Sequence, residues 1–72
     1  MSLIKRLDLH GIKHEEVDRL VENFVLLNEL PLRIITGNSN QMRDLVKKVL
    51  ERHNIGYEQF IPSQITILKE KK

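Results

Sequence analysis

Asp8 and His10 are the first pair of side chains in this sequence whose types and spacing could carry out chemistry. They stand two residues apart in the run Leu7-Asp8-Leu9-His10-Gly11. Side chains two apart on a β-strand share a face, so a carboxylate and an imidazole would point together. An imidazole titrates near neutrality and could accept a proton from water or a ribose 2′-hydroxyl. The alternative is that Asp8 caps the following turn and His10 is a polar strand end.

The segment Thr36-Gly37-Asn38-Ser39-Asn40 is the second candidate, because it leads into an expected helix. Backbone N–H groups at a helix N-terminus bind anions, and glycine permits close approach to the backbone. Arg43 follows in the first turns, where the helix dipole disfavours a cation and a bound phosphate would offset that cost. The predicted phosphate-binding residues are Gly37, Asn38, Ser39 and Arg43. The alternative is an ordinary N-cap loop beside a solvent-facing arginine.

Positive charge is concentrated in the second half of the chain. Residues 1–31 carry four Lys or Arg against six Asp or Glu, whereas residues 32–72 carry eight against four. Such a distribution could present a basic face to a polyanion, and Arg33 and Lys47 are predicted to contribute to it. Solvated helix faces account for the same charges, so both interpretations stay open.

Hydrophobic spacing predicts six elements that would position these residues. Residues 3–9 form a loosely alternating run that predicts a strand, and residues 13–28 carry an apolar stripe at helical spacing. A short β-branched run predicts a strand at 32–35, and a second apolar stripe from Met42 to Leu50 predicts another helix. Residues 57–61 and 65–68 are predicted to be strands joined through Pro62-Ser63-Gln64.

The order β-α-β-α-β-β predicts an α/β protein, specifically an α+β two-layer sandwich, with a single domain over residues 1–72. Right-handed crossovers place both helices on one face of a four-stranded mixed sheet whose strands we expect to be mainly parallel. Leu7 and Leu9 would then lie under the helices. Asp8 and His10 would occupy the open face, with Arg33 beside them.

Composition excludes several classes of site. The chain has no cysteine, so it has neither disulfides nor thiolate metal ligands, which fits a cytoplasmic protein. No run approaches the roughly 20 apolar residues of a membrane span, and no signal-peptide core is evident at the N-terminus. We expect no metal and no cofactor, and we expect structural roles for His14 and His53. Tyr57 and Phe60 are expected in the core, with stacking on a base as the alternative.

From Leu7 to Leu68 the chain resembles the small MutS-related (Smr) domain. The family's Asp-Leu-His-Gly motif matches fully at residues 8–11. Its second motif, His-Gly-x-Gly followed by Leu-Arg, matches in part as Thr36-Gly37-Asn38-Ser39 with Met42-Arg43. Pro62-Ser63-Gln64 replaces the family's glycine-rich turn before the last strand.

The resemblance implies a fold similar to the C-terminal domain of bacterial translation initiation factor three. It also implies a metal-independent endonuclease, a hydrolase of phosphodiesters, or a nucleic-acid-binding module. Family members act on branched or nicked DNA, or cut messenger RNA on stalled ribosomes, so RNA, branched DNA and the ribosome are the implied partners. Asp8 and His10 carry over as the catalytic pair, and Gly37 and Arg43 as substrate-binding positions.

Thr36 occupies the place of the second motif's histidine. The leading hypothesis is therefore an endonuclease, with RNA-binding favoured over DNA-binding. Its alternative is a non-catalytic nucleic-acid-binding module that has lost cleavage with that histidine. A third hypothesis is a protein-interaction adaptor that uses the open sheet face.

Overall fold

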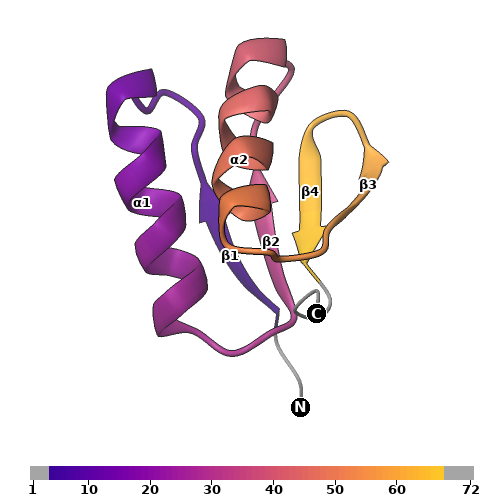
Figure 1. The fold of residues 1–72 in the computed structure, drawn as a ribbon. Coiled ribbons are helices and arrows are strands. Elements are labelled where there is room, and N and C mark those ends of the chain that lie inside the picture. Colours follow the sequence, from indigo (N-terminus) through magenta and orange to yellow (C-terminus); the bar gives the residue numbers. More distant parts are fainter. Residues whose placement is uncertain (1–3, 68–72) are drawn as a thin grey trace.

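A computed structural model describes residues 4–67, which form one four-stranded sheet and two helices (Figure 1). The elements are β1 (Lys5–Asp8), α1 (His14–Leu27), β2 (Leu32–Ile35), α2 (Asn40–Arg52), β3 (Glu58–Ile61) and β4 (Gln64–Ile67). The predicted order of elements and the α+β class are confirmed. The strands are shorter than expected, and Leu3 and Leu68, which we predicted at strand ends, lie outside the described residues.

The sheet has the strand order β1-β2-β4-β3. Only β1 and β2 pair in parallel, whereas β4 is antiparallel to both β2 and β3. The sheet is therefore mixed, as predicted, but the expectation of mainly parallel strands is wrong. The reason is the two-residue connection Pro62-Ser63, which is long enough for a hairpin and far too short for a parallel crossover.

Both helices cover the same face of the sheet (Figure 1). The pairing of Leu7 with Ile34, and of Ile34 with Ile65, places these side chains on the helix-bearing face. The core between the two layers consists of aliphatic residues; its largest fully buried members are Leu9, Leu32, Ile34, Leu50, Ile65 and Ile67. Burial of these side chains accounts for the fold, at about 1.5–3 kcal/mol each before the entropy of ordering is counted.

Helix α2 has a defined start and stop. The Ser39 side chain accepts the backbone N–H of Met42 at 3.1 Å, so it is the N-cap. At the other end Asn54 adopts a left-handed conformation with φ of 59°, which asparagine tolerates better than most residues. The helix therefore begins directly after the segment predicted to bind phosphate.

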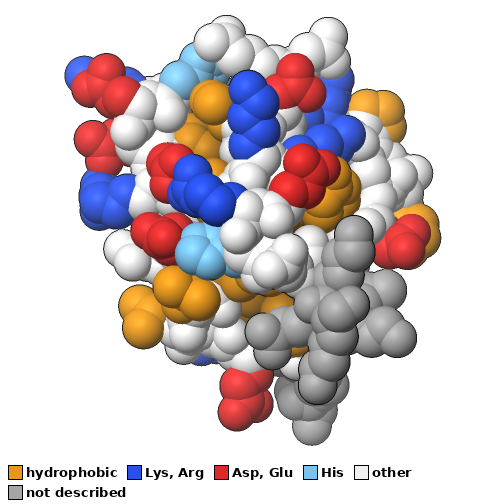
Figure 2. Space-filling view, viewed as in Figure 1, with side chains coloured by type: hydrophobic (Ala, Val, Ile, Leu, Met, Phe, Trp, Pro, Cys, Tyr) orange, Lys and Arg blue, Asp and Glu red, His pale blue; other side chains and the backbone are white. Residues whose placement is uncertain are grey.

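Two polar contacts join the helices across their exposed sides. Arg52 donates to the Asp18 carboxylate at 2.6 Å, and this hydrogen bond lowers the pKa of Asp18. The His53 ring and the Glu22 carboxylate lie 2.9 Å apart. Figure 2 shows acidic and basic side chains intermixed over this helix-bearing face. His53 thus has the structural role that we predicted.

Candidate nucleic-acid interface

Three connections meet at one end of the sheet, which we call the loop end: the turn at 9–13, the loop at 36–39 and the β3–β4 turn at 62–63. Because β1 and β2 are parallel, their C-terminal ends lie together, and the antiparallel β4 begins there. Backbone bonds hold the 9–13 turn to the end of β2, and the 36–39 loop to the β3–β4 turn. Leu9 donates to the Ile35 carbonyl at 2.9 Å, and Thr36 donates to the Ser63 carbonyl at 2.8 Å. Residues predicted to act together are therefore brought to one place.

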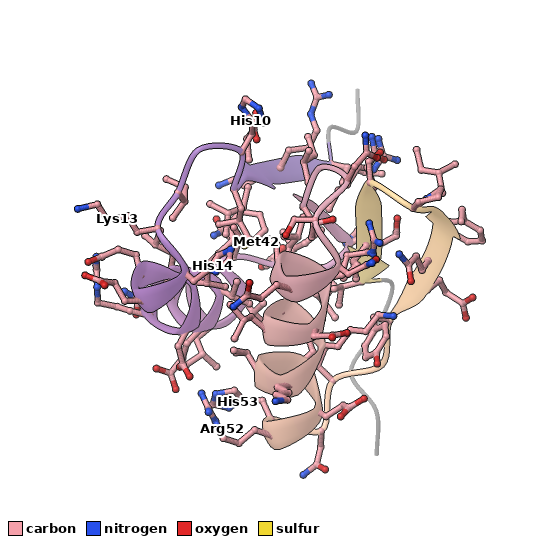
Figure 3. All side chains as sticks on the ribbon, turned by 90° about the horizontal axis from the view of Figure 1, so that it is seen from above. His10, Lys13, His14, Met42, Arg52 and His53 are labelled. Carbon is pink, nitrogen blue, oxygen red and sulfur yellow. The ribbon has the colours of Figure 1, made fainter. Side chains whose placement is uncertain are left out.

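The first motif forms a capped turn. β1 ends at Asp8, so His10 lies in the turn and strand alternation does not orient it. Instead, the Asp8 carboxylate accepts the backbone N–H of His10 at 2.9 Å. Gly11 follows with φ of +81°, a conformation that favours glycine. The His10 side chain is exposed and points away from both helices (Figure 3). Asp8 thus has the capping role that the sequence left open.

The second motif is closed against the hairpin turn. Thr36 is only 3% exposed, and both its backbone N–H and its hydroxyl donate to the Ser63 carbonyl. The Gly37 N–H donates to the same oxygen at 3.2 Å. The Gly37 amide, a predicted anion donor, is therefore already bonded within the protein, and so is the Thr36 hydroxyl beside it. Within residues 4–67 the backbone amides of Asn38 and Ser39 have no protein acceptor.

Gly37 leaves space beside this loop. Its φ is +69°, and a Cβ atom built on it would meet no heavy atom within 4 Å. The predicted close approach of a ligand to the backbone is sterically open at this position. Among residues 4–67, the loop amides left without a protein acceptor are those of Asn38 and Ser39, whereas that of Gly37 is bonded to Ser63.

Arg43 holds the loop end together. One terminal nitrogen donates to the Pro62 carbonyl at 2.7 Å and to the Gly37 carbonyl at 3.3 Å, and the other donates to the Asn40 side chain. The guanidinium is half-buried and linked to both the 36–39 loop and the hairpin turn. Its charge remains at the loop end, while three of its donor interactions are made within the protein. Lys47 follows one turn later on α2, half-buried.

Arg33 does not join this group. It pairs with Arg6 in the register of β1 and β2, and it lies on the sheet face opposite the helices. Its Nε is buried and has no hydrogen-bond partner in the part of the chain that the structure describes. The predicted binding residues are therefore divided: Asn38, Ser39 and Arg43 are at the loop end, whereas Arg33 is on the open face.

The structure adds Phe60 to the exposed side chains near the loop end, although we had assigned this residue to the core. Phe60 is 71% exposed, so the expectation that it packs in the core is wrong. Tyr57 does pack against the core, as expected, and its hydroxyl donates to Glu51 at 2.8 Å. Phe60 belongs to β3, the edge strand of the sheet, in which every residue is exposed. Edge position follows from strand order, which local sequence does not specify.

The histidines do not converge. Figure 3 shows His10 apart from His14 and His53, which lie on the helix side. Across residues 4–67 no group of three or more His, Asp or Glu side chains is placed to hold a metal ion. In the same residues no helix is long and apolar enough to cross a membrane.

Comparison with known proteins adds no relative. No family model, no curated protein and no solved structure matches the chain.

Proposed function

We propose that this protein binds the phosphate backbone of nucleic acid, preferentially RNA, at the loop end of its sheet. The observation that carries the proposal is the meeting of the Asp8–Gly11 turn with the 36–39 loop and Arg43 at one place. Among the described residues, the free N–H groups of Asn38 and Ser39, the open space beside Gly37 and the fixed positive charge of Arg43 together suit a phosphate group. The resemblance of both motifs to the Smr domain points to the same class of ligand.

Cleavage is the second candidate function, and the exposed His10 imidazole is the observation that favours it. The imidazole would take the proton of a ribose 2′-hydroxyl, whose oxygen attacks the adjacent phosphorus to form a cyclic phosphate, and the imidazolium would return that proton to the 5′-oxygen as it leaves. A positioned acid–base group contributes about 10²–10⁴-fold to rate. Asp8 is bonded to the backbone of His10, and Thr36 stands where the family has histidine. Cleavage would then rest on His10 alone, so binding is the better-supported function.

Binding and cleavage are separable in one experiment. Labelled single-stranded RNA and branched DNA are incubated with the protein in EDTA at low and moderate salt, and fluorescence anisotropy and product formation are both followed. Retention without products supports the binding function, and products that disappear in His10→Ala support cleavage. Neither retention nor products would contradict both and favour a protein-interaction adaptor.

Two variants that each remove one positive charge test where on the protein the nucleic acid binds. Lys47→Ala removes a predicted binding cation near the middle of α2, one turn beyond Arg43, and Arg52→Ala removes one from its last turn. Lys47→Ala should weaken binding of all sequences and reduce the slope of log affinity against log salt by about 1. Arg52→Ala should leave both quantities close to wild type. Equal effects of the two variants would indicate attraction by overall charge and contradict a loop-end site.

A further inference from the structure

We propose that Phe60 is a stacking platform for an unpaired nucleobase, which makes single-stranded nucleic acid the preferred ligand. The inference rests on the proposed function and names the form of its substrate. Phe60 is exposed beside Ile61 and Pro62, so three consecutive apolar side chains face solvent. Hydrophobic surface appears along the right-hand edge of Figure 2, over β3.

Folding does not account for this exposure. The chain has only three aromatic residues, and the other two, Phe24 and Tyr57, pack against the core. Within residues 4–67 Phe60 is not among the residues packed against the core, and it remains largely in water. A bound partner that covers the ring would recover the free energy that an exposed phenylalanine forgoes.

The surroundings of the ring match the chemistry of a base. Phe60 lines an open groove together with Arg43, Gln59, Ile61 and Pro62. Aromatic rings stack on bases regardless of sequence, and arginine adds a cation at such sites. The side-chain nitrogen of Gln59 donates to the Pro62 carbonyl at 3.3 Å, and the side-chain oxygen of Gln59 takes no part in this bond. That oxygen could accept a hydrogen bond from a base edge.

Arg43 belongs both to the groove and to the loop end. Arg43 lines the groove and also donates to the Gly37 carbonyl, and the Ser63 carbonyl holds Thr36 and Gly37. A nucleotide could therefore place its base on Phe60 and its phosphate at the 38–39 amides. Bases inside a duplex are already stacked on their neighbours, so a duplex could not use the ring.

A second exposed apolar pair provides a contrast. Leu26 and Leu27 at the end of α1 are also exposed, but the nearby groove contains Glu29 and no cation among its lining residues. The described lining has no aromatic ring, and the cation next to it, Lys5, is bonded to the Asn28 side chain. This surface supplies a control of similar hydrophobicity without the predicted chemistry.

Phe60→Trp gives a direct readout, because the sequence contains no tryptophan. Single-stranded RNA should quench the fluorescence of this variant in a saturable manner, whereas the same sequence annealed into a duplex should not. Phe60→Ala and Phe60→Leu should each weaken single-strand binding by about 5- to 100-fold, the range expected for one stacked base. Leu27→Ala should bind like wild type.

The outcomes separate this inference from the function on which it rests. Binding detected by anisotropy without quenching, and unchanged by Phe60→Ala, would overturn the platform and leave phosphate binding intact. No binding by wild type would overturn the proposed function, and the platform with it. Sedimentation that shows a dimer which Phe60→Ala dissociates would identify the edge of β3 as a surface for a second copy and contradict the platform.

Discussion

The Asp8 carboxylate accepts the backbone N–H of His10 at 2.9 Å, so the first motif is organised by a side chain bonded to the main chain. This bond fixes the turn from which the imidazole projects. It assigns Asp8 a role in positioning His10 through the backbone. That role differs measurably from that of a carboxylate that orients or charges the imidazole.

Replacement of Asp8 separates the two roles. Asp8→Asn should retain the turn and the binding of RNA, because the amide oxygen can accept the same N–H. Asp8→Ala should lower the free energy of unfolding by about 1 kcal/mol through loss of a capping bond. Urea denaturation and RNA anisotropy measure both effects. A fully stable Asp8→Asn that has lost an RNA-cleaving activity of the wild type would instead show that the negative charge itself is needed.

Thr36→His places at this position the histidine of the Smr family's second motif. The variant tests whether the structure around residue 36 can accommodate that ring. Thr36 is buried, and its hydroxyl bonds to the Ser63 carbonyl, so a larger ring must displace its neighbours. We expect a loss of about 1–3 kcal/mol from overpacking, and no gain of cleavage in EDTA. Thr36→Ser keeps the hydroxyl and should be closer to wild type. A stable Thr36→His that cuts RNA would show that the pocket admits the ring.

Arg43→Lys keeps the charge at the loop end but removes the planar fork that reaches the Pro62 and Gly37 carbonyls. The variant should lose about 1 kcal/mol of stability and bind RNA more weakly, with an unchanged salt slope. Arg43→Ala should in addition reduce that slope. Lys48→Ala, an exposed cation on the same helix, is the control for stability. Wild-type stability in both Arg43 variants would contradict its role in joining the loops.

Tyr57 is the only tyrosine, so its ionisation can be followed by ultraviolet absorbance in a chain without tryptophan. Burial, followed by the hydrogen bond to Glu51, raises the pKa of Tyr57 above 10.0. The folded state therefore favours the neutral phenol. Its stabilising contribution is complete below pH 10 and is lost as the pH rises through the folded pKa.

Glu51→Gln should lower the pKa of Tyr57 only in part, because burial is the larger cause and persists in this variant. The unfolded protein in urea provides the reference titration. A wild-type midpoint equal to that reference would contradict the packing of Tyr57 against the core.

Local patterns determined much of the fold. The stripes of Val17 and Val21 on α1, and of Val46 and Leu50 on α2, predicted both helices because helical periodicity is a property of neighbouring residues. The order of elements and the placement of both helices on one face followed from that reading and from the handedness of crossovers. The residue types of the first motif also marked the turn where the loop end begins.

Tertiary structure decided the rest, because it depends on which distant backbones pair. The insertion of β4 between β2 and β3, antiparallel to both, left β3 and its residue Phe60 at an exposed edge. The same pairing brought the Ser63 carbonyl to Thr36 and Gly37, whose backbone N–H groups donate to it. The Gly37 N–H, which we had predicted to bind an anion, is therefore already bonded. Hydrogen bonds between residues about 27 positions apart, such as that from Thr36 to Ser63, have no signature in local spacing.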